Sequence, residues 1–260
     1  QADPQLGPMP SYMTLRRFFR SQGLHKRPRR GPVHSPGAQA AEVRFETREV
    51  RSYQSDHVNA LWHLDFHHGS RRVLLPGGQW VYPILLGILD DCSRLCGHAQ
   101  WYLSETAEVL THGLSQAFQK RELPRALMSD NGSAMLAGEI EAGLLRLGIV
   151  HERTLPYSPY QNGKQESWWN QIEGRLLPML EGVVDLSLAA LNEATLAWVE
   201  LEYNRKHHSE LGKSPLDVYI HARDVGRPSP STQALQEAFT LRAVRTQRRS
   251  DGTLSLEGRR

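Results

Sequence analysis

The chain has 260 residues, of which 39% are hydrophobic and 23% charged, and its formal net charge is +3. This length suits one large domain with small appendages or two modest domains, and the hydrophobic fraction is sufficient for a buried core. We expect neither a membrane span nor a signal peptide, and two cysteines are too few for a disulfide-rich secreted protein, so we expect a reducing, cytoplasmic setting.

The charge is unevenly distributed along the chain. Residues 1–30 contain seven Lys or Arg and one acid, and residues 241–260 contain six Arg and two acids. The region between them therefore carries a net charge of −7. Basic ends around an acidic middle indicate nucleic-acid contacts at the ends, and basic tails without a partner are the alternative.

Near the start, Ser11 is a candidate N-cap and Gly23 a candidate C-terminal stop, which predicts a helix over 12–22. One such helix cannot bury its apolar side alone, and the chain starts with Gln. We therefore expect it to be the last helix of a DNA-binding module whose earlier helices lie upstream. Residues 25–40 are rich in Pro, Gly and basic residues, which is typical of a linker.

The middle of the chain alternates between strand and helix patterns. Apolar patterns predict strands at 61–68, 79–89, 95–103, 126–130 and 149–154, a turn at Pro76-Gly77-Gly78, and helices at 105–120 (capped by Ser104), 136–147, 165–180 and 188–206. Three antiparallel strands followed by alternating helices and strands predict an α/β fold: a mixed five-stranded sheet with helices on both faces. In the tail, Asp251-Gly252 predicts a hairpin that begins a small β-module.

Three carboxylates occupy unusual positions in this pattern. Asp65 lies inside a strand, Asp130 ends a strand, and Glu166 opens a helix, with 35 residues (131–165) between Asp130 and Glu166. Asp is disfavoured inside strands, and a buried carboxylate needs a partner or a cation. The apolar stripe through Trp169 and Ile172 leaves Glu166 at its edge, so we expect Glu166 to face the other two acids. Converging carboxylates repel one another, and Mg²⁺ or Mn²⁺ relieves that repulsion.

Five ordered motifs now resemble a known family: WHLDFHH, GILDDCSR, SDNGS, PYSPYQNGKQES and YNRKHHSELGKSPLDVY. Together they resemble the integrase catalytic core of the DDE transposase/integrase family, shared by bacterial insertion-sequence transposases and retroviral integrases. The resemblance implies an RNase H-like fold and assigns Asp65, Asp130 and Glu166 as catalytic residues that hold two Mg²⁺ (or Mn²⁺) ions. The expected domains are the end of a helix-turn-helix-like module (1–24), a basic linker (25–55), the catalytic core (56–222), and a linker with the start of a C-terminal β-barrel-like module (223–260).

Other polar residues of the core have simpler interpretations. Retroviral integrases carry a His₂Cys₂ zinc module, whereas Cys92, Cys96 and His98 are too few for one, so we expect no zinc. Asp90 and Asp91 are expected to shape a turn and to pair with Arg94. We expect Gly132 to permit a tight turn, Asn131 to orient Asp130, and Trp168 and Trp169 to pack in the core; His67, His68 and residues 205–208 are weaker candidates for phosphate contacts.

DNA contacts are expected from basic residues before the core and from the loop before Glu166, where hydroxyl and amide groups can bind phosphates and Tyr rings can stack on bases. These residues are Arg16, Arg17, Arg20, Lys26, Arg27, Arg29, Arg30, Tyr157, Tyr160, Gln161, Asn162 and Lys164.

The sequence therefore predicts a DNA transposase/integrase that cleaves transposon ends and transfers the 3′-OH into target DNA. Its expected partners are transposon-end and target DNA and further copies of itself, with a helper ATPase as an open possibility and no membrane. The expected location is the bacterial cytoplasm, on the nucleoid. The alternatives are a catalytically silent transposase-derived DNA-binding protein, a ribonuclease H or Holliday-junction nuclease, and a glycosidase with paired carboxylates.

Overall fold

A computed structural model describes residues 12–22, 54–154, 163–241 and 253. The chain divides into two compact units, residues 1–49 and 50–260. In the first unit, α1 (Tyr12–Ser21) confirms the helix predicted from Ser11 and Gly23. Among the described residues, no helix is both long enough and apolar enough to cross a membrane.

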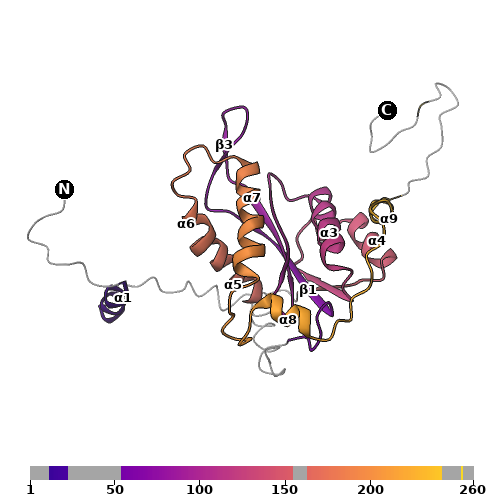
Figure 1. The fold of residues 1–260 in the computed structure, drawn as a ribbon. Helices are drawn as coiled ribbons and strands as arrows, with labels where there is room; N and C mark the ends of the chain where they lie inside the picture. Colours follow the sequence, from indigo (N-terminus) through magenta and orange to yellow (C-terminus); the bar gives the residue numbers. More distant parts are fainter. Residues whose placement is uncertain (1–11, 23–53, 155–162, 242–252, 254–260) are drawn as a thin grey trace, which may run out of the picture. The chain divides into compact units, whose positions relative to one another are not determined.

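The second unit is built on a five-stranded mixed sheet (Figure 1). Its strands are β1 (Leu61–His68), β4 (Ile84–Asp90), β5 (Cys96–Tyr102), β6 (Ala126–Ser129) and β7 (Val150–Arg153). They lie in the order β5-β4-β1-β6-β7; β1, β4 and β5 are antiparallel, whereas β6 and β7 are parallel to β1. The predicted mixed α/β sheet is confirmed.

The strand predicted over 79–89 is wrong in one respect, because it is two strands. A separate hairpin forms from β2 (Val73–Leu74) and β3 (Trp80–Val81), and the main sheet resumes only at Ile84. The predicted turn closes this hairpin through the Gly78 N–H, which donates to the Leu75 carbonyl at 2.8 Å. Pro83 separates the two strands because proline has no N–H for a sheet hydrogen bond.

Helices cover both faces of the sheet (Figure 1). One face packs against α3 (Ala107–Arg121), α4 (Gly138–Arg146) and α9 (Thr232–Ala238). The other packs against α5 (Gly163–Gln171), the π-helical segment η2 (Ile172–Leu176), α6 (Leu177–Met179), α7 (Leu188–Trp198) and the π-helical segment η3 (Val199–Tyr203). A further short helix, α8 (Pro215–His221), was not predicted. The helix expected to start after Ser104 is instead capped by Thr106, whose hydroxyl accepts the Val109 N–H at 3.3 Å.

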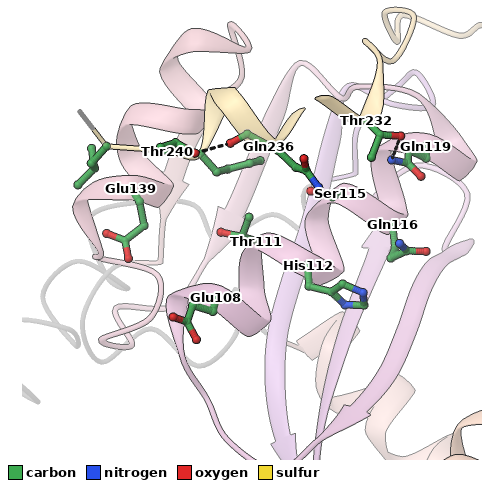
Figure 2. A pocket seen from close by; sticks show the side chains of 12 residues that line it. Glu108, Thr111, His112, Ser115, Gln116, Gln119, Glu139, Thr232, Gln236 and Thr240 are labelled. Carbon is green, nitrogen blue, oxygen red and sulfur yellow. Dashed lines mark hydrogen bonds between the residues drawn. The ribbon is translucent and has the colours of Figure 1, made fainter. Parts of the chain in front are cut away.

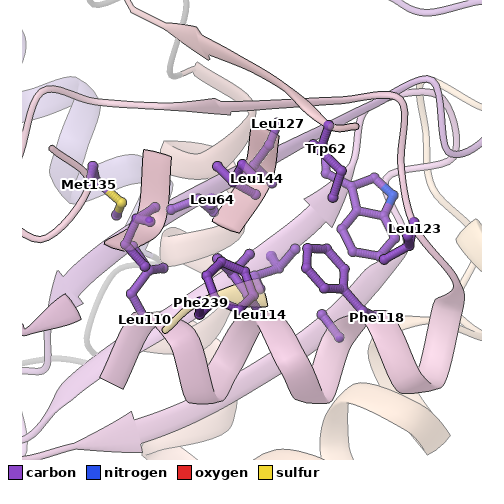
Figure 3. Close-up of a cluster of buried hydrophobic side chains, with 14 of the residues drawn as sticks. Trp62, Leu64, Leu110, Leu114, Phe118, Leu123, Leu127, Met135, Leu144 and Phe239 are labelled. Carbon is purple, nitrogen blue, oxygen red and sulfur yellow. The ribbon is translucent and has the colours of Figure 1, made fainter. Parts of the chain in front are cut away.

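Alternation along β4 divides the core into two clusters. Leu86 and Ile88 join the cluster with α3, α4 and α9, whereas Leu85 and Leu89 join the cluster with α5 and α7. Figure 3 shows the first cluster, to which α3 contributes Leu110 and Leu114. The four leucine and isoleucine side chains of β4 are almost fully buried, which contributes about 1.5–3 kcal/mol each. A strand that is buried on both faces typically has a continuous run of apolar residues in its sequence, as β4 does.

The segment expected to be a linker from residue 223 contains a packed helix. Phe239 follows α9 and lies against α4, where a Cβ added to Gly143 would come within 2.2 Å of its ring. A groove of about 620 Å³ remains between α3 and α9 (Figure 2), and none of the three candidate carboxylates lines it. The hairpin predicted at Asp251-Gly252 falls outside the described residues.

Candidate active site

Two of the three candidate carboxylates lie on neighbouring parallel strands. Asp65 is the fifth residue of β1, and Asp130 directly follows β6. The register pairs His63 with Met128, so Asp65 and Asp130 stand at corresponding positions two residues further along. The fold therefore brings both acids to the same part of the sheet, as their positions in the sequence predicted.

Local hydrogen bonds hold each strand carboxylate. Asp65 Oδ1 accepts the Phe66 N–H at 2.8 Å, and Asp65 Oδ2 lies 3.4 Å from Trp169 Nε1, which donates to it. Asp130 Oδ1 accepts the Gly132 N–H at 2.9 Å. The prediction that Asn131 orients Asp130 is wrong in this structure, because the Asn131 side-chain amide donates to the Thr154 carbonyl at 3.1 Å.

Helix α5 approaches β1 over a glycine. Gly87 on β4 pairs with Asp65, and a Cβ at this position would meet the rings of Trp168 and Trp169 at 2.4 and 2.7 Å. The Gln165 side chain, fully buried, donates from Nε2 to the Gly87 carbonyl at 3.2 Å. The missing side chain at Gly87 therefore lets α5 lie directly on the strand pair that carries Asp65, and the predicted packing role of both tryptophans is confirmed.

Glu166 lies in the first turn of α5, one helical turn before Trp169. Its side chain is exposed, and Trp169 contacts Asp65, so this helix brings Glu166 to the side of the sheet where Asp65 lies. Among the described residues, however, no three His, Cys, Asp or Glu side chains are close enough together to hold a metal ion. The elements that carry the three acids come together, but their side chains do not form a closed ligand set.

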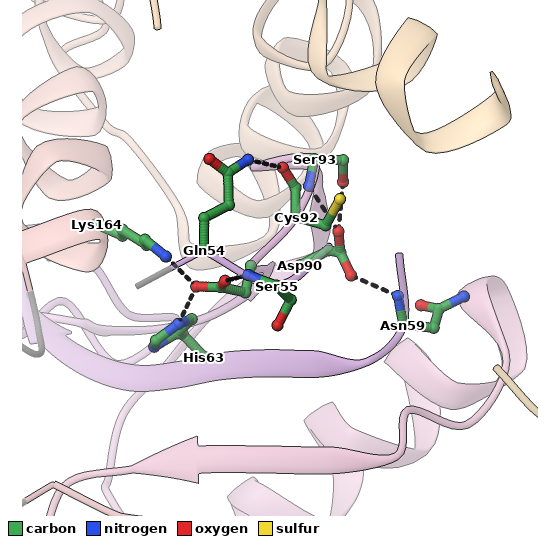
Figure 4. Close-up of polar contacts among 9 residues, drawn as sticks. Gln54, Ser55, Asn59, His63, Asp90, Cys92, Ser93 and Lys164 are labelled. Carbon is green, nitrogen blue, oxygen red and sulfur yellow. Dashed lines mark hydrogen bonds and ion pairs between the residues drawn. The ribbon is translucent and has the colours of Figure 1, made fainter. Parts of the chain in front are cut away.

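Asp90 ends β4 and Asp91 begins the predicted turn, and no ion pair among the described residues joins either carboxylate to Arg94. Figure 4 shows the polar contacts around Asp90. Asp90 accepts the backbone N–H groups of Asn59 and Ser93 at 2.7 and 2.8 Å. Burial raises the pKa of the Asp90 carboxyl despite these bonds. The predicted pairing with Arg94 is therefore wrong, because Asp90 is satisfied by the N–H of Asn59, before β1, and by the N–H and hydroxyl of Ser93.

Asp91 is bound by partners from distant parts of the chain. His63 Nε2 lies 2.6 Å from Asp91 Oδ1, the Ser55 N–H donates to Oδ2 at 2.7 Å, and the Lys164 ammonium also contacts Oδ1. Burial alone would raise the pKa of Asp91, but these bonds outweigh it and hold the pKa below its usual value. Sequence reasoning missed this cluster because its members are 28 to 73 residues apart in the chain.

Two further acids near the candidate site carry no signal in the sequence pattern. The Oε1 of Glu105 and the Oδ1 of Asp130 both lie within 3.3 Å of the point where a Cβ of Gly132 would stand. Glu173, on η2, accepts hydrogen bonds from Ser70 and lies 2.9 Å from His67 Nε2. The His67 ring in turn stacks on Trp169 with centroids 4.9 Å apart, so His67 packs against α5 in this structure.

The residues expected to bind DNA fall into three groups. Arg16, Arg17 and Arg20 lie on α1, where Arg17 is exposed. Lys164 lies at the start of α5 and contacts Asp91. The remaining residues, Lys26, Arg27, Arg29, Arg30, Tyr157, Tyr160, Gln161 and Asn162, lie outside the described residues.

Comparison with known families identifies this arrangement. Residues 55–159 match the integrase core domain family. This segment of the chain is therefore similar to integrase core domains. The matched segment includes Asp65 and Asp130 and ends before Glu166, so the assignment of Glu166 depends on the spacing in the sequence and on the position of α5.

Relatives of this segment include retroviral proteins. The Pol polyprotein of Ovine maedi visna related virus (strain South Africa) is 25% identical over 126 residues, which are 48% of this chain and 11% of that protein. A chain in the simian T-cell lymphotropic virus intasome, solved in complex with PP2A regulatory subunit B56 gamma, is 18% identical with a TM-score of 0.58. The match covers 70% of this chain and 61% of the intasome chain, and it confirms the RNase H-like fold.

A third relative is the HTLV-2 integrase catalytic core domain in complex with magnesium, at 19% identity and a TM-score of 0.48 over 65% of this chain and 99% of that one.

The two cysteines of the chain, Cys92 and Cys96, are buried free thiols, and Cys96 Sγ lies 3.5 Å from the His98 carbonyl. Burial raises the pKa of the Cys92 thiol to about 11, so it is protonated at neutral pH.

Proposed function

We propose that this chain is a polynucleotidyl transferase that cleaves DNA at transposon ends and joins the freed 3′-OH to target DNA. The observation that carries the proposal is the position of Asp65 and Asp130 at corresponding points of two parallel strands, with α5, the helix that carries Glu166, packed against the first of them. In the first step, water attacks a phosphodiester and releases a 3′-OH. In the second, that 3′-OH attacks a target phosphodiester and displaces its 3′ oxygen.

The three acids are proposed as ligands of Mg²⁺ or Mn²⁺. Their chemistry fits, because hard divalent cations prefer carboxylate oxygens, and their supporting elements meet at one place. A pair of ions bound there would neutralise charge on the phosphoryl group and stabilise the attacking and leaving oxygens. The chain's own part is positional: the Gly132 N–H and the Trp169 indole fix the two strand carboxylates, and α5 presents Glu166.

We further propose that the protein acts as an oligomer on DNA, since two transposon ends must be joined, with Arg16, Arg17 and Arg20 among its contacts to DNA. Bacterial cytoplasm and a helper ATPase remain part of this hypothesis. The retroviral relatives support the resemblance to retroviral integrases rather than the resemblance to bacterial insertion-sequence transposases.

A strand-transfer assay tests the proposal. A labelled duplex from the end of the element would be mixed with supercoiled target in Mg²⁺, Mn²⁺ or chelator, using wild type, Asp130→Asn and Glu166→Gln. We expect metal-dependent joined product from wild type and a loss of at least about 10³-fold in each variant, because each variant removes a proposed ligand while keeping the side chain's size.

The matched control is Glu139→Gln, on α4, which is an acid outside the proposed site and should retain activity. DNA binding without joined product under every metal condition would instead favour the catalytically silent DNA-binding protein. Full activity in Asp130→Asn or Glu166→Gln would contradict the assignment of these residues.

A further inference from the structure

The start of α5 is fixed to the sheet by two side chains that precede the proposed catalytic residue in sequence. Lys164 reaches Asp91 in the turn after β4, and Gln165 reaches the Gly87 carbonyl within β4. Glu166 comes next in the chain and is exposed. The two contacts therefore set both the height and the rotation of the helical turn from which Glu166 projects.

Asp91 is held rigidly enough to serve as an anchor. It is 1% exposed, and its carboxylate is bound from three sides by the Ser55 N–H, His63 and Lys164 (Figure 4). His63 lies on β1, two residues before Asp65. A single carboxylate therefore connects the strand that carries Asp65 to the helix that carries Glu166.

We propose that Asp91 is a positioning residue for the reaction: through Lys164 it holds the first turn of α5 at the distance from β1 that lets Glu166 complete the site with Asp65. This inference rests on the proposed function. It gives Lys164 a role distinct from the DNA contact expected from the sequence, because its ammonium is half-buried against an acid. Polar partners behind a ligand typically change metal affinity or activity about 10–100-fold when they are removed.

The test compares Asp91→Asn and Lys164→Met with wild type in the full chain. The Mg²⁺ concentration for half-maximal strand transfer should rise about tenfold or more in both variants, while Kd for a random-sequence duplex in chelator stays unchanged. A DNA-contact role for Lys164 predicts another pattern: Lys164→Met weakens duplex binding in chelator, and neither variant changes the Mg²⁺ requirement. That pattern would overturn the proposal.

Arg175→Met is the matched control, because Arg175 lies further along the same helical run and pairs with Glu202. It removes a cation and an ion pair as Lys164→Met does, and it should leave the Mg²⁺ requirement unchanged. Lys164 is only half-buried, so Lys164→Met keeps the test valid if Asp91→Asn does not fold.

Amide hydrogen exchange across α5 provides a measurement that does not depend on activity. Exchange of α5 should accelerate about tenfold in Asp91→Asn and Lys164→Met and not in Arg175→Met, since removal of an anchor favours local opening. If wild type is inactive but shows this exchange pattern, the proposed function is refuted, while the role of Asp91 and Lys164 in holding α5 is supported. An active wild type with unchanged exchange and an unchanged Mg²⁺ requirement would refute the anchor alone.

Discussion

Two buried polar residues, Asp91 in the turn after β4 and His98 on β5, differ in how their hydrogen-bonding groups are satisfied. Asp91 has partners on every side, whereas His98, which is 4% exposed on β5, has no hydrogen bond to either ring nitrogen within the described part of the chain. Burial, assisted by the positive charge of Lys120, lowers the pKa of His98 to about 3. The imidazole is therefore neutral in the folded protein at neutral pH.

This lowered pKa predicts a pH dependence of stability. An unfolded histidine has a pKa of about 6.5, so between about pH 6.5 and pH 3 the unfolded state binds a proton that the folded state does not. The free energy of unfolding should fall as pH drops through this window, with His98 contributing up to about 1.4 kcal/mol per pH unit.

Urea unfolding of wild type and His98→Leu at several pH values measures this contribution. The variant should lose less stability than wild type between about pH 6.5 and pH 4, and the difference between the two proteins should be constant above about pH 7.5. If the free energies of unfolding of the two proteins differ by the same amount at every pH, His98 binds a proton equally well in the folded and unfolded states.

At the scale of elements, the proposed site depends on how closely α5 lies on β1 and β4. Gly87→Ala places a methyl group 2.4 Å from the Trp168 ring, so both tryptophans must shift. Overpacking of this kind costs about 1–3 kcal/mol. Because Trp169 donates to Asp65, we expect strand transfer to fall about tenfold or more even at temperatures where the variant is folded.

Gly97→Ala, on the neighbouring β5, is the control for this substitution. Its new methyl group would meet only the Arg121 side chain at 3.5 Å and the Ile88 carbonyl at 3.8 Å, which are ordinary contacts. The smaller chain entropy of alanine in the unfolded state should then stabilise the protein by about 0.5–1 kcal/mol. Thermal unfolding and strand transfer of both variants would be measured, and two variants of equal stability and activity would argue against close approach at Gly87.

The elements themselves were largely predictable, because alternation and periodicity are local properties of the sequence. The strand at 61–68 and the helices opening near 165 and 188 emerged with nearly their predicted starts. The packing of α9 and Phe239 was missed, since a seven-residue helix offers too few periodic positions to be distinguished from a linker. The partners of Asp91 were missed for another reason: contacts between residues 28 to 73 positions apart leave no local pattern.

At the scale of the whole molecule, charge separates the ends of the chain from its middle. Seven basic residues and one acid lie in residues 1–30, and the region from 31 to 240 carries a net charge of −7. An acidic middle repels a phosphate backbone at long range, so DNA affinity should depend strongly on the ends. This proposal concerns net charge along the sequence and requires no particular arrangement of the two units.

Replacing the seven basic residues between 16 and 30 with Gln would change the net charge from +3 to −4. Each phosphate that the variant no longer neutralises should reduce the slope of log K against log salt by about 0.9. Titration of a labelled duplex at several KCl concentrations would give this slope for wild type, for the Gln variant, and for a variant with the order of residues 12–30 scrambled.

If binding is electrostatic, the variant with the scrambled segment should have the same slope as wild type, and the Gln variant should have a much shallower slope. If the scrambled segment also has a shallow slope, the folded helix α1 rather than its charge is what binds, and an unchanged slope in the Gln variant would place the phosphate-binding residues elsewhere in the chain.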